Sequence, residues 1–170
     1  FLAGYWPNNT SNIFKKAATD MGYLVDLNVT FVDKPEDCNL YVGIGFESVR
    51  HLYGKLKNDW NLATWNFDSI INVNWNFNIV NGVGFINKKH VNNQMLFEYY
   101  SYRILVVSLG FTGRCSNAHG DSIFIQPFIS CKPPNALDRL AMKLMYNEKI
   151  KPKMKIHDIK TIVRNHKLLE

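Results

Sequence analysis

The sequence contains little charge for its size. Only 20% of its 170 residues are Asp, Glu, Lys or Arg, whereas 46% are hydrophobic and 14% are aromatic. Disordered chains have low hydrophobicity and high net charge, so this composition excludes a disordered protein. A chain of this length can bury one sizeable core and is short for two domains. We therefore expect one globular domain whose surface is polar more than ionic.

Cysteine is also scarce, since the chain has only Cys38, Cys115 and Cys131. Three cysteines allow one disulfide and leave one thiol over. Cys115 and Cys131 flank a turn-rich loop, and a bridge between them would contribute about 3 kcal/mol through loop closure. We favour this bridge. The alternative is three buried thiols, which would suit a cytosolic protein.

No segment has the character of a membrane span. The longest apolar run, residues 91–110, is about as long as a bilayer is thick, but it contains Glu98, Arg103 and three tyrosines. Charged side chains are costly in lipid. Asparagines at its start can cap a helix, and Gly110 can end one. Apolar residues lie on nearly every face, so the run predicts a central buried helix.

Glu98 and Arg103 are the only charged residues of this predicted helix. Five positions apart, they lie too far round the helix to pair well, so each should have its own partner. One interpretation places Glu98 on the solvated first turns and buries the apolar stem of Arg103. The other interpretation has Arg103 line a cleft and hold an anionic group.

The rest of the chain predicts short helices and strands, and so the α+β class. We expect helices at 12–21, 47–57, 136–146 and 157–167, and strands at 23–31, 39–46, 72–80 and 83–86. Alternating apolar residues indicate the strand at 23–31, and Asn81-Gly82 indicates a hairpin turn. The predicted fold is a small, mostly antiparallel sheet packed on the central helix 91–110, with C-terminal helices.

Tryptophan and asparagine recur together in the middle of the sequence. Trp60, Trp65 and Trp75 each lie beside or near asparagines. Indole rings stack on sugars and amides bond to hydroxyls, which would suit a carbohydrate surface. Large aromatic residues more often pack in cores or loops, and we favour that interpretation.

The C-terminal half resembles a known family. The segments that carry the resemblance are LGFTG at 109–113, DSIF at 121–124, ALDRLA at 136–141 and LMYNEKIKPKM at 144–154. They are similar to a bacterial exported family of unknown function that is related to the zincin metallopeptidases. The last helix of that family reads roughly L-D-R-x-x-L-x-x-L-Y-D-P-R-I-K-P-G-M. The resemblance implies a zincin-like domain, with residues 91–110 in the place of the active-site helix.

An active zincin carries H-E-x-x-H on that helix, so that two histidines hold zinc and a glutamate activates water. Alignment on Gly110 puts Arg103 and Val107 at the histidine positions and Ile104 at the glutamate. None of these side chains can take over the zinc chemistry. We therefore expect no zinc, no other metal and no cofactor at this place.

Four residues around the predicted helix remain candidates for binding a ligand. Glu98 and Arg103 lie on the helix, and His119 and Asp121 lie in the loop after it, where some zincins place a third ligand. No spaced histidine pair supports a metal at these residues. Solvated loop side chains are the ordinary alternative.

All of the excess positive charge lies near the C-terminus. Residues 132–170 contain ten Lys or Arg against four Asp or Glu, a net charge of +6 that equals that of the whole chain. Such a region could bind lipid head groups, an acidic glycan or nucleic acid. The sequence has no nucleic-acid motif, which disfavours the last. We divide the chain into a zincin-like domain, 1–154, and a basic helical extension, 155–170.

Taken together, the sequence predicts a degenerate peptidase that binds and does not catalyse. The resemblance implies export to the periplasm or beyond, with the signal peptide removed. The partner would be an envelope or host protein, or an anionic glycan. One alternative is a metal-independent hydrolase that uses Arg103 to position an anionic substrate and Glu98 or Asp121 as base. Another is a structural subunit of an envelope assembly that docks through the terminal helix.

Overall fold

The computed structural model describes residues 2–3, 9–52, 65–75, 79–111, 121–124, 132–151 and 153–166. Its helices are α1 (Thr10–Leu24), α2 (Phe46–Val49), α3 (Gln94–Ser108), α4 (Ala136–Met145) and α5 (Ile156–Asn165). Its strands are β1 (Leu2–Ala3), β2 (Leu40–Ile44), β3 (Phe67–Val73) and β4 (Ile79–Ile86). Short 3-10 turns cover Pro35–Asp37, Arg50–Leu52 and Lys88–His90. The predicted α+β class is confirmed.

The sheet is mixed, which corrects the expectation of mostly antiparallel pairing. Its strand order is β1-β2-β4-β3. Strands β1 and β4 both run parallel to β2, and the edge strand β3 runs antiparallel to β4. Parallel neighbours need a crossover connection between them. The long connection from β2 to β4 contains α2 and β3, so only β3 and β4 form a hairpin.

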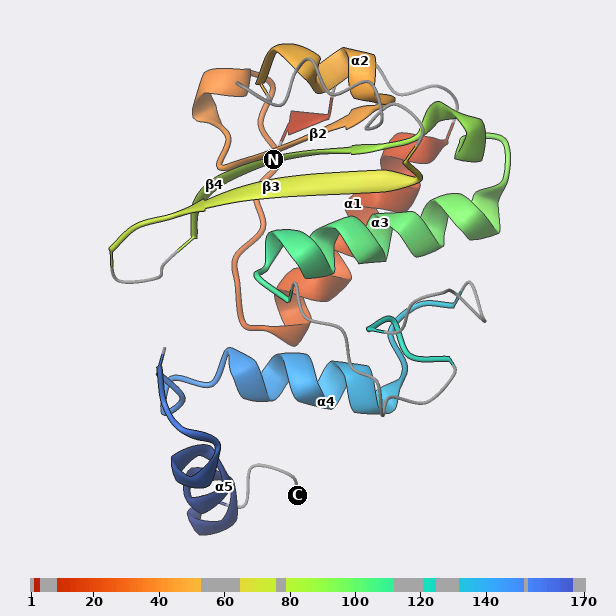
Figure 1. Ribbon diagram of the computed structural model, residues 1–170. Coiled ribbons are helices and arrows are strands. Elements are labelled where there is room, and N and C mark those ends of the chain that lie inside the picture. The colour runs from red at the N-terminus through yellow and green to blue at the C-terminus, as the bar shows by residue number, and fades with distance from the viewer. Residues whose placement is uncertain are drawn as a thin grey trace.

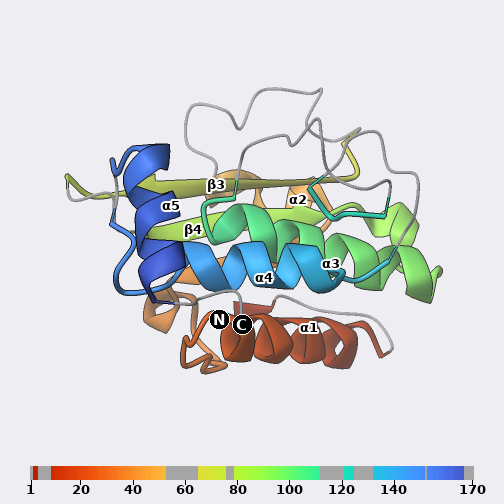
Figure 2. The same ribbon diagram turned by 90° about the horizontal axis from the view of Figure 1, so that it is seen from below.

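The described elements form layers around the sheet (Figures 1 and 2). Helices α1 and α3 lie side by side beneath the sheet, and α4 lies beneath them. On the opposite face, Phe46 and Val49 of α2 pack on Phe85 of β4. The main core lies between the sheet and the helix pair, where Phe14 of α1 and Phe97 of α3 are fully buried.

Helix α3 is the central element that the sequence predicts. It begins after Asn93, whose side chain accepts a hydrogen bond from the backbone N–H of Leu96, and it ends at Ser108, with Leu109 as the C-cap. Gly110 follows with a φ of 90°, a left-handed conformation that favours glycine. Ten of its fifteen residues are buried, so it contacts protein on almost every side.

The strand expected at 23–31 is wrong. Helix α1 extends to Leu24, and Asp26 then turns the chain with a φ of 56°. Residues 27–32 run past the end of α1 without joining the sheet. Val29 packs so closely on this helix that a Cβ on Gly22 would lie 2.3 Å from its Cγ2. The apolar alternation therefore reflects packing on a helix, which the sequence pattern does not distinguish from a strand.

The hairpin exists, but its turn is not at Asn81-Gly82. Both residues lie inside β4, where Gly82 pairs with Ile71 of β3. The side chain of Asn72 donates to that of Asn81 across the two strands at 2.6 Å. The pairing of β3 with β4 over this whole length outweighs the local turn preference of Asn-Gly.

The C-terminal helices agree well with the sequence. Asn135 and Asp138 form a reciprocal capping box at the start of α4. The predicted terminal helix is α5, in which no residue is buried. No helix in the described part of the chain is long and apolar enough to cross a membrane.

Close contact between β4 and α3 leads to the first testable expectation. A Cβ on Gly84 would lie 2.6 Å from Cδ1 of Ile104 and 2.8 Å from the carbonyl oxygen of Asp68. We expect Gly84→Ala to lower the free energy of unfolding by about 1–3 kcal/mol, measured by urea denaturation. Gly82→Ala is the control, because its nearest contacts would be 3.2 and 3.3 Å and its loss should be smaller. Equal losses would contradict this account of the packing.

Candidate functional site

The three positions aligned with the zincin motif are packed against protein. Ile104 is fully buried and contacts β4 at Gly84. Arg103 is only 6% exposed, and Val107 is partly buried. An isoleucine and a valine have no donor atom for a metal. This part of α3 therefore serves the core.

The Arg103 guanidinium is held inside the molecule by contacts from two other segments. Its Nη1 donates a hydrogen bond to the carbonyl oxygen of Ile123. Its charged carbon lies 5.5 Å from the centre of the Phe67 ring on β3, a cation–π geometry. Burial lowers the pKa of Arg103, while Tyr99 and Asp138 oppose that shift. Arg103 thus joins α3, β3 and the 121–124 segment.

Asp138 holds in place the segment that contains Ile123, the partner of Arg103. Its carboxylate is 3% exposed and accepts hydrogen bonds from the Ser122 hydroxyl and from the backbone N–H groups of Ile123 and Asn135. The two backbone bonds measure 2.9 and 3.0 Å. A buried carboxylate needs such donors because it has lost its water. Asp138 therefore fixes the loop whose carbonyl group receives Arg103.

A second ionic contact joins α1 to α4. Arg139 donates to Asp20 through both terminal nitrogens, at 3.2 and 2.8 Å, and the Tyr102 hydroxyl donates to the same carboxylate at 2.9 Å. The Arg139 hydrogen bond is the main cause that lowers the pKa of Asp20. Burial, followed by the Asp20 hydrogen bond, raises the pKa of Tyr102. These shifts reflect a structural contact between helices.

Two further groups have shifted pKa values away from these contacts. Burial lowers the pKa of His90, whose Nε2 is 2.9 Å from the Asn66 side-chain oxygen and whose ring packs against Tyr100 at a tilt of 34°. Burial also raises the pKa of Asp68 on β3. Side chains alternate along a strand, and its neighbour Ser69 faces α3, so Asp68 faces the α2 side of the sheet.

The four predicted ligand residues do not meet in one described site. Arg103 is committed to Ile123, as above. Glu98 is partly buried and contributes to the raised pKa of Tyr102. Asp121 accepts a hydrogen bond from the Asn135 side chain at 3.1 Å. His119 lies outside the described residues, as do the two cysteines of the predicted bridge, Cys115 and Cys131.

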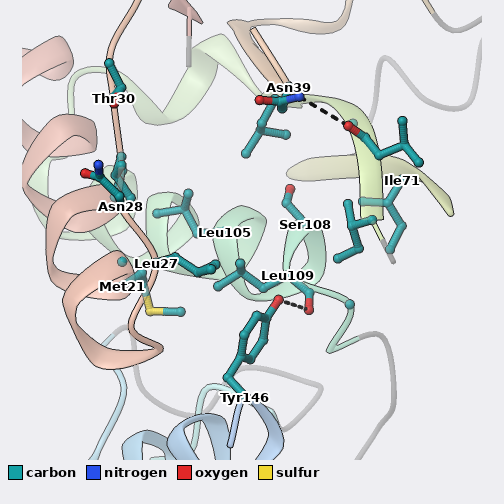
Figure 3. A pocket seen from close by; sticks show the side chains of 18 of the residues that line it. Met21, Leu27, Asn28, Thr30, Asn39, Ile71, Leu105, Ser108, Leu109 and Tyr146 are labelled. Carbon is teal, nitrogen blue, oxygen red and sulfur yellow. Dashed lines mark hydrogen bonds between the residues drawn. The ribbon is translucent and has the colours of Figure 1, made fainter. Parts of the chain in front are cut away.

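The described structure contains a mostly apolar cavity of about 970 Å³ at the C-terminal end of α3 (Figure 3). It lies between the sheet and the ends of α1, α3 and α4, with residues 27–32 along one side. Leu105, Ser108 and Leu109 of α3 line it opposite Ile71 of β3. Pockets of about 300–1,000 Å³ with mostly apolar walls are typical ligand sites.

A few polar groups accompany the apolar wall. The hydroxyl groups of Ser108 and Ser69 are 2.8 Å apart. Tyr146 closes the floor, where its hydroxyl donates to the carbonyl oxygen of Leu109 at 2.8 Å, and burial raises its pKa to about 12. Asn39 lines the side nearest β2 and donates to the carbonyl oxygen of Val80. Because its pKa is raised, the side chain of Tyr146 is a neutral phenol at physiological pH.

The sequence analysis missed this cavity. Its walls come from seven separate segments, and each contributes only two to five residues. The sequence holds only a weak signal for the cavity. Apolar residues such as Leu27, Val80 and Met145 lie at or near the ends of helices and strands, where solvent-exposed polar residues are expected. A clear prediction would have required knowing how these ends converge.

Within the described residues, no group of three or more His, Cys, Asp and Glu side chains is placed to hold a metal ion. Comparison with known proteins adds no further guide. No family model and no curated protein matches the sequence, and no solved structure matches the fold. The resemblance to the exported zincin-related family therefore stays a prediction.

The second testable expectation concerns Asp138. Asp138→Asn would place an amide group, itself a donor, among three donors, so we expect the free energy of unfolding to fall by about 2–3 kcal/mol. Chemical denaturation followed by circular dichroism measures the change. Asp121→Asn is the matched control. Asp121 accepts one hydrogen bond from the Asn135 side chain, and an asparagine oxygen can still accept it, so the free energy of unfolding should fall by about 1 kcal/mol or less. If Asp138→Asn leaves the free energy of unfolding unchanged, the Asp138 carboxylate does not stabilise the fold as described.

Proposed function

We propose that this protein is a binding module of zincin-like lineage, without a zinc site, that acts at the bacterial envelope or towards a host. The observation that carries the proposal is the position of Arg103. In the alignment it replaces the first zinc ligand, and in the structure it is buried and bonded to Ile123. A positive guanidinium at this place disfavours a metal cation through direct repulsion.

The titratable groups also favour binding over catalysis. Enzymes gather groups with shifted pKa values in one cleft. Here such groups are dispersed over separate structural contacts: Asp20 with Arg139, Arg103 with Ile123, and His90 with Asn66. Among the described residues that line the cavity, Tyr146 has a shifted pKa, and its hydroxyl already serves the backbone of α3.

The lining of the cavity limits which kinds of ligand can bind in it. Its wall is mainly leucine, isoleucine, valine and methionine. Sugar hydroxyls would lose their hydrogen bonds to water against such a wall, which costs free energy for each unpaired group. An aliphatic chain or the apolar side chains of a partner would gain by burial. We therefore favour an apolar ligand group over a glycan at this site.

Metal content tests the first part of the proposal. Elemental analysis of protein purified without chelator should show no stoichiometric zinc or other transition metal. His119→Ala should leave the result unchanged. If about one metal per chain binds, and is lost in His119→Ala, the protein has a metal site and should be assayed as a hydrolase.

Ligand binding tests the second part. We expect cis-parinaric acid, a fluorescent fatty acid, to bind and gain fluorescence. Met145→Asp, at a cavity residue that is 58% exposed, should weaken binding about tenfold or more, because it places a charge against the apolar chain. Leu137→Asp is the control on the same helix, 61% exposed and away from the cavity. Absence of binding, or equal effects of the two changes, would refute the cavity as the site.

A further inference from the structure

The described residues at the end of the hairpin formed by β3 and β4 carry no charge, and they expose asparagines (Asn72, Asn74 and Asn81) as well as apolar side chains. No Asp, Glu, Lys, Arg or His occurs between residues 69 and 87. Trp75, just after β3, is 99% exposed, and Val73, Ile79 and Val80 around it are exposed as well. Val73, Ile79 and Val80 also line the cavity, so its apolar wall continues onto the hairpin. An indole group so fully exposed to water is an unusual feature of a folded surface.

Helix α5 is amphipathic, and a basic stretch runs from just before it into the helix. Ile156, Ile159, Ile162 and Val163 recur on one side of the helix; Ile156 is 67% exposed, and the other three are partly buried. Six Lys or Arg and a single Asp lie between residues 149 and 164, and all six basic side chains are exposed. A helix with an apolar stripe beside lysine and arginine is typical of segments that lie in a membrane interface.

These two features lie on the same side of the molecule. Figures 1 and 2 both place α5, the end of α4 and the end of the hairpin on the left; in Figure 1 the hairpin lies at the level of the sheet and α5 lies below α4. Met145, the last residue of α4, lines the cavity and is exposed. The cavity therefore reaches the surface on this side, between the uncharged hairpin and the basic segment. We define this side by Trp75, Met145 and α5, and name it the docking end.

We propose that the docking end binds the surface of an anionic phospholipid bilayer. This inference rests on the proposed binding function and names its partner. Tryptophan is favoured at the level of the head groups, where its ring is partly in hydrocarbon and its N–H remains hydrated. Each lysine or arginine near an anionic surface adds to the electrostatic attraction.

The charge distribution favours a bilayer over an acidic protein. The positive charge lies on one side of the cavity, and the hairpin on the other side carries none. A fluid bilayer offers anionic head groups and hydrocarbon together over a wide area, so it can satisfy both features without a matched shape. A protein partner would need an acidic patch and an apolar patch at the same separation.

Vesicle sedimentation tests the proposal on the full chain. We expect binding to vesicles of phosphatidylcholine with phosphatidylglycerol, weakened by added salt, and much weaker binding to phosphatidylcholine alone. The double change Lys160→Glu and Arg164→Glu should weaken binding to the anionic vesicles about tenfold or more. The double change Lys88→Glu and Lys89→Glu alters the net charge equally at the other end of β4 and should have a much smaller effect.

A matched pair of tryptophan substitutions tests the apolar contact with the bilayer. Trp75→Ala should weaken vesicle binding about tenfold or more, whereas Trp65→Ala, before the start of β3, should not. Equal effects within either pair, or no binding of the wild-type protein to anionic vesicles, would overturn the proposal. Capture of an acidic protein by the docking end without vesicle binding would also overturn it. The metal and fatty acid measurements need no vesicles, so a failure here leaves the proposed binding function standing.

Discussion

The buried Asp138 carboxylate is the contact on which the lower half of the structure depends. It joins the start of α4 to the Ser122 hydroxyl and the Ile123 amide, and the Ile123 carbonyl in turn receives Arg103 of α3. A buried negative charge is tolerated only where several donors replace water. One side chain therefore aligns a helix start, a loop and the central helix. The contact between Arg139 and Asp20 then adds α1 to the same assembly.

This network gives a physical meaning to the segments that resemble the exported family. Ser122 and Ile123 belong to the DSIF segment, Asp138 and Arg139 to ALDRLA, and Tyr146 bonds to Leu109 of LGFTG. These residues hold elements of the fold together. A resemblance in these residues would therefore support a shared fold and would not by itself indicate an activity.

The sequence predicts the elements whose signals are local and misses what depends on tertiary packing. Helix α3 could be predicted because its apolar residues cover every face and Asn93 caps it. The segment 23–31 alternates like a strand although it packs on α1, and Asn81-Gly82 resembles a turn although β3 pairs through it. The role of Asp138 requires knowing that Ser122 folds back on it. The cavity depends on the meeting of seven segments and has no sequence pattern of its own.

The cavity follows from how α3 packs against the sheet. Gly82 and Gly84 lie on the same face of β4, because they are two residues apart. At Gly84 the helix approaches so closely that Ile104 would meet a Cβ, whereas the nearest neighbours of a Cβ on Gly82 belong to the strands beside it. A straight helix and a twisted sheet diverge away from their closest contact. The space therefore opens towards the end of α3 and the hairpin. The same packing that buries Ile104 against β4 thus leaves the cavity at the end of the helix.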